Sequence, residues 1–288
     1  MRRIKSFRRK SFAENLLHCF VSVIFMIVAL SYVYILVWAV QSALKSHNEI
    51  VMTPFSLPTT WHWENFTEVF TKLEANGVNF FGMLGNSIWF SVGATIIQQM
   101  VTMTFAYCCS KYKFWGSTWP YVIILVMITL PLYGTGGAIY KLYHNLGLIN
   151  SRWQILIAAS GFNIHFLYYT AYFKNLSWTY AEAAMMDGAN AFDIFYRVMF
   201  PQAKPIFAAL FITSWKGEWN NYSSGLVYYP KLPTLPVGIY QFNKEMIYRA
   251  RLDILFAACV FVSIPALVLY IMFNKTITTN VSIGGIKG

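Results

Sequence analysis

Long stretches without a charged residue constrain this chain more than any other feature of its sequence. Five of them lack Asp, Glu, Lys and Arg altogether: 19–40, 83–107, 119–140, 153–173 and 254–273. A sixth stretch, about 206–228, is interrupted only by Lys216 and Glu218. Each has about the 20 residues that a helix needs to cross a bilayer. The sequence therefore predicts an all-α membrane protein with six transmembrane helices.

The composition supports this fold class. Hydrophobic residues make up 57% of the chain and charged residues only 11%, whereas a soluble domain carries roughly 25% charged residues. Membrane lipid must therefore cover much of the surface. The first apolar stretch, 19–40, is longer than the apolar core of a signal peptide, which has about 7–15 residues, so we expect it to be retained as a span.

The distribution of basic residues predicts the orientation. Six of the 22 Lys and Arg residues lie in "MRRIKSFRRK", ahead of the first span. A cytoplasmic N-terminus places 1–18, 108–118, 174–205 and 274–288 on the cytoplasmic side, and these segments hold 13 of the 22. This bias favours an N-in/C-in topology. The basic residues do not gather into one binding face, so no nucleic-acid partner is expected.

The chain is expected to form one membrane domain. It runs over 19–273, between a cytoplasmic basic N-terminus (1–18) and a cytoplasmic tail (274–288), and residues 174–205 form its main cytoplasmic loop. No repeat of 20–50 residues is visible. The four cysteines show no zinc-site spacing, so no metal site is expected.

The cytoplasmic loop reads like part of a soluble protein: "YAEAAMMDGANAFDIFYRVMFPQAKP" (180–205). Thr179 and Glu182 have the spacing of a capping box, which predicts that a helix starts there. Gly188 stands where a left-handed C-terminal cap is needed. Asn190 can cap a second short helix, and Pro201 is expected to end it.

The second helix is expected to have an apolar face formed by Phe192, Phe195, Val198 and Met199. Pro205 would then suit the first turn of the next span. On these residues alone the loop could be an ordinary connector packed on its own helix bundle. It could equally be a rigid element that contacts another protein.

A family resemblance favours the second interpretation. The spacing E-A-A, three residues, G, with "VMFP" as its ending, resembles the EAA loop of binding-protein-dependent ABC importer permeases. Three further stretches resemble the carbohydrate-uptake, MalG-like branch of the family: "HNLGLINS" (144–151), "PTLPVGIYQF" (233–242) and "GGIKG" (284–288). The resemblance covers roughly residues 80–288. The Gly-rich "GTGGA" (134–138) departs from relatives that often carry a second proline there.

The resemblance implies a type I ABC importer fold and a set of partners. These are a second homologous permease, two cytoplasmic ATPase subunits that bind ATP and Mg, and an extracytoplasmic sugar-binding protein. It also implies a bacterial cytoplasmic membrane location. In such importers the EAA loop docks on an ATPase subunit as a coupling helix. The residues carried over to this role are Glu182, Ala183, Ala184, Met185, Asp187, Gly188 and Ala189.

The stretch "SWKGEWNNY" (214–222) is the most polar one within an expected span. A charged residue there is costly in lipid, so Lys216 and Glu218 should face protein or a wet cavity. A break at Gly217 could bring them together. Trp215 and Trp219 lie four apart and share a helix face, where they could stack on a sugar ring. The expected substrate pathway comprises Trp215, Glu218, Trp219, Asn220 and Tyr133; the alternative is polar contact with the partner permease.

Four other polar residues lie within the expected spans: Gln98, Gln99, Asn163 and His165. Hydrogen bonding between helices is their expected role. The Gly-rich "YGTGGA" (133–138) is either a locally unwound segment or a place of close helix packing.

Two other function classes have less support from the sequence. A self-sufficient secondary transporter or channel would need an intramembrane carboxylate or His relay, for which only Glu218 and His165 are candidates. A membrane-embedded enzyme has no supporting motif. The chain also lacks the Gly-rich phosphate loop of an ATPase, so we expect a non-catalytic transport subunit.

Overall fold

The structure is a computed structural model that describes residues 12–130, 134, 136–249 and 251–280. Over these ranges the chain is helical and forms no β-strand, only an isolated bridge between Ala75 and Val78. The all-α class is therefore confirmed for the described residues. The α-helices are α1 (Phe12–Ala43), α2 (His47–Met52), α3 (Glu64–Lys72), α4 (Phe80–Lys111), α5 (Trp119–Thr129), α6 (Gly136–Asn145), α7 (Ile164–Asn175), α8 (Thr179–Met186), α9 (Ala191–Asp193), α10 (Phe200–Trp219), α11 (Tyr222–Tyr228), α12 (Leu235–Arg249) and α13 (Leu252–Asn280). A 3₁₀ helix, η1 (Arg152–Ala158), precedes α7, and a π-helix, η2 (Ile194–Met199), precedes α10.

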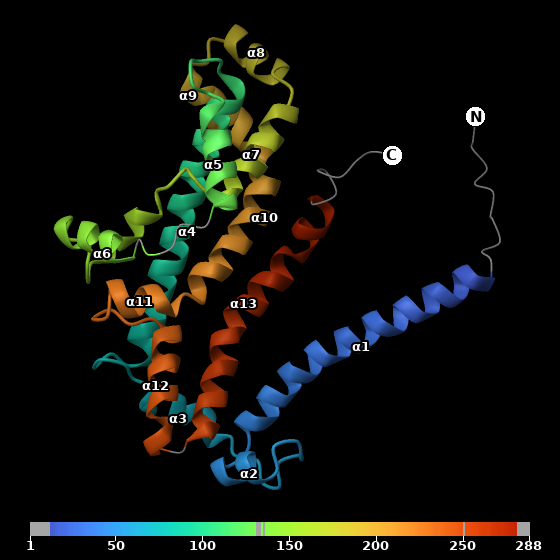
Figure 1. The fold of residues 1–288 in the computed structure, drawn as a ribbon, viewed down its shortest axis with the longest axis vertical. Coiled ribbons are helices and arrows are strands. Elements are labelled where there is room, and N and C mark those ends of the chain that lie inside the picture. The colour runs from blue at the N-terminus through green and yellow to red at the C-terminus, as the bar shows by residue number, and fades with distance from the viewer. Residues whose placement is uncertain (1–11, 131–133, 135, 250, 281–288) are drawn as a thin grey trace.

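Helix α4 is the centre of the bundle. It packs against α7, α10 and η1, while α13 packs against α10, α12, α3 and α1. In Figure 1, α8 and α9 lie at one end of the molecule and α2 and α3 at the other. We call these the α8 end and the α3 end. By the expected topology the α8 end faces the cytoplasm.

Each end of the molecule has its own buried hydrophobic cluster. At the α8 end, Met103 and Tyr107 of α4 pack with Phe173, Ala181 and Phe195. At the α3 end the cluster includes Val69, Met83, Trp215, Leu235 and Ile254. Each cluster joins helices that are far apart in sequence, so each end is a packed unit rather than a set of loops.

Three described helices are long and apolar enough to cross a membrane: Glu14–Ala43, Phe80–Lys111 and Leu252–Phe273. They contain the expected runs 19–40, 83–107 and 254–273. Helix α5, with 11 residues, is apolar but shorter. The other three expected runs are divided, and each extends over two consecutive helices with a break between them.

The breaks have local causes. Within 153–173, η1 ends at Ala158, and the side-chain oxygen of Asn163 caps α7 by accepting from His165 N. Gly161 in the same break lies so close to Phe105 that a Cβ would approach its ring at 2.7 Å. Within 206–228, α10 ends at Trp219, and Asn221 caps α11 by accepting from Ser224 N. Within 119–140, α5 ends at Thr129 with Leu130 as its C-cap, and Gly134 has φ +87°, which lies outside the α-helical region.

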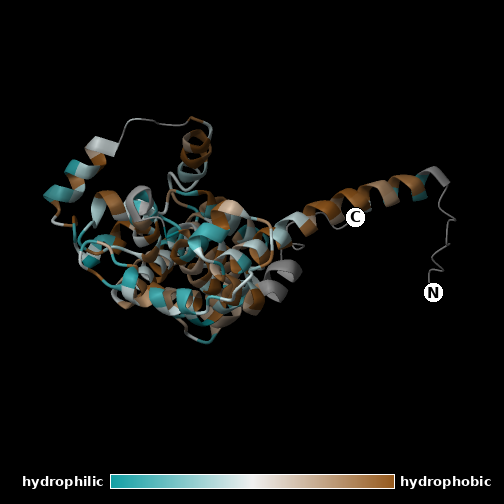
Figure 2. Ribbon diagram, turned by 90° about the horizontal axis from the view of Figure 1, so that it is seen from below, coloured by the Kyte–Doolittle hydropathy of each residue, from teal (hydrophilic) through white to brown (hydrophobic). Residues whose placement is uncertain are grey.

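Helix α1 extends away from the bundle. Its apolar side chains are exposed along most of its length, for example Phe25 at 70% and Tyr32 at 68%. Figure 2 shows mainly hydrophobic residues along the middle of this projecting helix. A helix that is apolar on every side needs lipid or other helices around it. It begins at Phe12, so the expected cytoplasmic segment 1–18 lies partly in α1 and partly outside the described residues.

Charged groups tie the α3 end together. Arg251 Nη2 donates to Glu68 Oε2 at 2.6 Å and to Asp253 Oδ2 at 2.9 Å, which links α3 to the start of α13. Lys45 is fully buried, and its Nζ donates to the carbonyl oxygens of Thr53 and Pro54. The end of α1 is thus fixed to the segment that follows α2.

Candidate functional site

The first short helix of the cytoplasmic loop, α8, starts differently from the expectation. Its N-cap is Trp178, which makes no side-chain capping bond. The capping box of Thr179 and Glu182 is therefore wrong. Thr179 is already the first helical residue; its backbone N–H donates to Ser177 Oγ at 3.3 Å, and its Oγ1 accepts from the Ser177 hydroxyl at 3.0 Å. The hydroxyl group of Ser177 thus forms hydrogen bonds to the first residue of α8.

The end of α8 has the expected left-handed cap. Gly188 has φ +82°. Its N–H donates to Met185 O at 3.0 Å, and the N–H of Ala189 reaches back to Ala184 O at 2.9 Å. This pair of bonds is a Schellman motif, which satisfies the carbonyls that a helix end leaves open. The prediction for Gly188 is confirmed.

The second short helix starts at the expected cap. Asn190 Oδ1 accepts from the N–H groups of Phe192 and Asp193, both at 3.0 Å. Asp193 in the first turn pairs with Arg197 at 3.2 Å. Cap and ion pair fix the direction in which the chain turns back toward the bundle.

Pro201 does not end this helix, so that prediction is wrong. Helix α9, η2 and α10 follow one another without a gap. Phe200 N–H donates to Phe195 O, five residues back. The wider π turn relieves the clash between a proline ring and the carbonyl four residues earlier. Pro205 accordingly lies inside α10 instead of in its first turn.

The apolar face of the second helix is partly confirmed. Phe195 and Met199 are buried and Val198 is half-buried, but Phe192 is 68% exposed. Ile194 is buried instead.

The loop residues singled out by the sequence lie on one exposed helix and its cap. Glu182, Ala183, Met185, Asp187 and Gly188 are exposed, while Ala184 and Ala189 are partly buried. Large apolar side chains stand beside them: Met186 is 89% exposed and Tyr180 is 53% exposed. Ala181, on the opposite side of α8, is fully buried. The helix therefore has one face in the bundle and a mixed apolar and acidic face outward.

Helix α4 anchors the loop at both of its ends. Lys111 Nζ donates to Leu176 O at 2.5 Å, just before α8, and lies 5.9 Å from the centre of the Trp178 ring. Tyr107 packs on Phe195, just after α9, with ring centroids 4.8 Å apart. The segments before and after α8 are therefore both in contact with α4.

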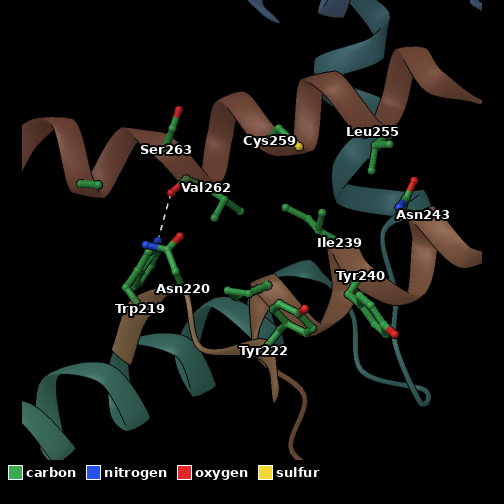
Figure 3. Close-up of a pocket in the computed structure, with 12 residues that line it drawn as sticks. Trp219, Asn220, Tyr222, Ile239, Tyr240, Asn243, Leu255, Cys259, Val262 and Ser263 are labelled. Carbon is green, nitrogen blue, oxygen red and sulfur yellow. Dashed lines mark hydrogen bonds between the residues drawn. The ribbon is translucent and has the colours of Figure 1, made fainter. Parts of the chain in front are cut away.

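A cleft lies on the other half of the molecule, between the end of α10, α11, α12 and α13. Its volume is about 580 Å³, and Trp219, Asn220, Tyr222, Tyr240, Asn243 and Ser263 are among its lining residues. Figure 3 shows these side chains around the cleft. Trp219 Nε1 donates to Val262 O at 3.1 Å, which joins α10 to α13.

The expected pathway residues are only partly brought together. Trp219 and Asn220 line the cleft. Trp215 stacks on Trp219 with ring centroids 5.1 Å apart, as their shared face predicted; both are buried, and Trp215 is not among the lining residues. Glu218 lies beside Asn221 and Tyr229, not among the lining residues. Tyr133 lies outside the described residues.

The break at Gly217 that could have brought Lys216 and Glu218 together is absent. Helix α10 continues through Gly217 to Trp219. Lys216 and Glu218 therefore stay two positions apart on a regular helix and do not share a face. Lys216 is exposed and Glu218 is half-buried.

Polar residues inside the bundle join α4, α7 and α10. Gln99 Nε2 donates to Ser214 Oγ at 2.6 Å and lies 2.7 Å from His165 Nδ1, and Tyr169 donates to Gln99 Oε1 at 2.7 Å. Asn163 Nδ2 donates to Thr102 Oγ1 at 2.7 Å. The expected hydrogen bonding between helices is confirmed for Gln99, Asn163 and His165, and for Gln98 it stays a prediction.

Sequence reasoning missed several residues of these two regions. Lys111 was only one of the positive charges that set the orientation, yet it holds the loop. Tyr222, Tyr240 and Asn243 of the cleft come from helices whose packing no local pattern specifies. "PTLPVGIYQF" was the available signal for α12, since it contains Tyr240.

Comparison with known proteins decides the family. The model of the family described as binding-protein-dependent transport system inner membrane component matches residues 105–282. The chain belongs to this family. Its members are permease subunits of ABC transporters, so the expected resemblance is confirmed, and the chain is a membrane-embedded transport subunit.

Relatives match over most of the length of this permease. It is 30% identical to the diacetylchitobiose uptake system permease protein NgcG of Streptomyces coelicolor, over 86% of this chain and 82% of the relative. It is 25% identical to the arabinooligosaccharides transport system permease protein AraQ of Bacillus subtilis, over 92% and 94%. It is 26% identical to the galactooligosaccharides transport system permease protein GanQ of the same organism, over 95% and 96%.

A solved structure shares the fold. It is a chain of a bacterial ABC transporter involved in the import of the acidic polysaccharide alginate, with a TM-score of 0.76 and 22% identity. The match covers 93% of this permease and 99% of that chain. The type I permease fold therefore agrees with the expectation from the sequence.

Proposed function

We propose that this permease is the transmembrane subunit of an ATP-driven importer in a bacterial cytoplasmic membrane. It translocates a carbohydrate that an extracytoplasmic solute-binding protein delivers. A second homologous permease completes the membrane part, and two cytoplasmic ATPase subunits bind ATP and Mg and supply the energy. The family match supports the transport role, and the names of three relatives, each given for an oligosaccharide, support the substrate class.

The observation that carries the proposal is the exposed face of α8. A helix that is buried on one side through Ala181 and ends in a fixed cap at Gly188 is rigid enough to transmit a displacement. Met186 and Tyr180 are exposed beside Glu182 on a segment expected in the cytoplasm. Exposed apolar residues within a polar rim suit a protein partner. The ATPase subunit is the partner that we assign to this face.

The contacts of Lys111 and Tyr107 give this docking a mechanical consequence. When the ATPase pair closes on ATP and moves α8, the movement passes to α4, the central helix of the bundle. Helices α7 and α10 pack on α4 and move with it. This is how closure in the cytoplasm would change the access of the cleft at the other half of the molecule.

We propose six spans in the N-in/C-in arrangement. Helices α1, α4 and α13 have the length and composition for crossing alone. Of the remaining three spans, one contains α5, one contains η1 and α7, and one contains α10 and α11. Breaks within a span are tolerated where the backbone is buried in protein or lines a cavity.

The alternative, a self-sufficient secondary transporter, has less support. Its candidate carboxylate, Glu218, does not line the cleft, and the Nδ1 atom of its candidate histidine, His165, is engaged by Gln99 and Ser214. A proton relay would need these groups free to exchange protons along a path.

Reconstitution tests the proposal. The permease, its partner permease and the ATPase pair are placed in proteoliposomes, and uptake of labelled oligosaccharides is measured with and without ATP and the binding protein. We expect uptake only when both are present. Uptake by this chain alone, driven by an ion gradient, would overturn the proposal.

A further inference from the structure

The α10–α13 cleft has a lining that distinguishes between classes of sugar. None of the twelve described residues that line it is Asp, Glu, Lys, Arg or His. Polar groups are nevertheless present, as the amides of Asn220 and Asn243 and the hydroxyls of Tyr222, Tyr240 and Ser263. The lining thus offers hydrogen-bonding groups, and none of its side chains carries a formal charge.

The polar atoms differ in what they can give to a ligand. Asn220 Nδ2 donates to Lys216 O at 2.8 Å, so its amide oxygen can accept from a ligand hydroxyl. Ser263 Oγ donates to Val260 O at 2.7 Å and keeps acceptor capacity. Asn243 is an exposed residue of α12 and can both donate and accept. Hydroxyl-rich ligands match such a mixture.

Aromatic rings supply the flat surfaces of the cleft. Tyr222 and Tyr240 stack with ring centroids 4.8 Å apart and planes 20° apart. Trp219 is only 3% exposed and its N–H group is bonded to Val262 O, so the exposed aromatic surface comes from the tyrosines and Trp219 offers no donor. An apolar face of a pyranose ring can pack on such surfaces while its hydroxyls reach the amides.

Lys244 is a cation that lies beside the lining and not in it. Lys244 Nζ lies 4.7 Å from the centre of the Tyr240 ring, and the residue is exposed. A carboxylate on a sugar seated among Asn220, Tyr222 and Ser263 would lose water and gain no opposite charge from the lining. Taking a charge out of water without a partner is unfavourable.

We propose that this cleft is a glycan subsite selective for uncharged sugar units over uronic acids. The inference rests on the proposed carbohydrate import and specifies its substrate class. The selectivity is a property of the permease itself, additional to any selection by the binding protein.

Binding to the assembled permease–ATPase complex in lipid nanodiscs, without the binding protein, tests this inference. The probes are neutral gluco-, galacto-, arabino- and chito-oligosaccharides, together with a galacturonic acid trimer and a glucuronate-containing disaccharide. Saturation-transfer NMR measures contact with each. We expect contact with at least one neutral probe and at least tenfold weaker contact with both acidic ones.

Asn243→Lys provides the second arm, because it adds a cation to an exposed position of the lining. We expect it to strengthen binding of the acidic probes and weaken that of the neutral ones. Asn145→Lys, at the exposed end of α6, adds the same charge away from the cleft and should leave the preference unchanged.

The outcomes separate this inference from the import function. Equal contact with acidic and neutral probes, contact with no probe, or no effect of Asn243→Lys overturns the subsite. Failure of ATP-dependent and binding-protein-dependent uptake overturns the proposed function instead. If uptake proceeds while the binding arms fail, only the neutral-sugar subsite is wrong.

Discussion

At the scale of single residues, Gly188 is the position where backbone geometry and proposed coupling meet. Its φ of +82° is one that residues with a side chain adopt at a cost, and its Schellman bonds fix the end of α8. A Cβ there would meet no atom within 4 Å, so a substitution acts through the backbone and not through a clash.

Gly188→Ala should therefore reduce coupling without unfolding the bundle. The left-handed conformation costs alanine about 1 kcal/mol, and we expect substrate-stimulated ATP hydrolysis by the assembled complex to fall several-fold. Gly77→Ala is the matched control, since Gly77 has φ +78° and equally open surroundings at the other end of the molecule. Equal losses from both substitutions would mean that the effect is general destabilisation.

Glu68 gives a prediction on pH at the α3 end, outside the expected spans. The hydrogen bond from Arg251 is the largest cause that holds the pKa of Glu68 below its usual value of 4.5. A lowered carboxylate pKa means that the ionised form stabilises the fold above about pH 4.5, and this contribution is lost as the pH falls below that value.

Glu68→Gln should lower the melting temperature of the purified permease at pH 7, and the difference from the unmodified chain should shrink below about pH 4.5. Thermal melts at a series of pH values measure this. Glu74→Gln, at an exposed carboxylate two residues after α3, serves as control and should change little. A difference that stays constant down to pH 3.5 would contradict the role of the Arg251 contact.

At the scale of elements, the link between α4 and the loop depends on Lys111. Lys111→Met keeps the aliphatic stem but removes the bond to Leu176 O and the cation above Trp178. A hydrogen bond from a charged group contributes about 1.5–3 kcal/mol. We expect stimulated ATP hydrolysis to fall several-fold while the permease still assembles with its ATPase subunits.

Lys113→Met is the matched control for that element. Lys113 is exposed in the same connection between α4 and α5. The Lys113→Met substitution should leave the rate of ATP hydrolysis within about twofold of that of the unmodified complex, because exposed charges contribute little to stability. Copurification of the ATPase subunits with both variants shows whether assembly is retained. Similar activity of both variants would exclude Lys111 as the anchor.

The same scale shows what the sequence could and could not predict. Long stretches without charged residues predicted α1, α4 and α13, and Gly188 and Asn190 predicted two helix caps, because each of these signals lies within a short stretch of sequence. The π turn before Pro201 and the burial of Trp215 depend on packing against other helices, which no window of sequence contains. The start of α8 failed as a prediction because Ser177, two positions earlier, engages Thr179. The cleft depends on four elements that meet only in three dimensions.

At the scale of the whole molecule, the two ends should lie on opposite sides of the membrane. In a background without native cysteines, Glu74→Cys and Asn175→Cys place single thiols at exposed positions of the two ends. We expect an impermeant thiol reagent to label Glu74→Cys in intact cells and Asn175→Cys only after lysis. Labelling of both in intact cells would contradict the proposed orientation.

The central claim, that the α8 face docks on an ATPase subunit, is tested most directly by site-specific photo-crosslinking. A photoreactive residue replaces Met186, which is 89% exposed beside Gly188, or Met52, which is 80% exposed at the α3 end. In the assembled complex we predict a crosslink to the ATPase subunit from position 186 and none from position 52. Crosslinking from neither position, or equally from both, would contradict the account.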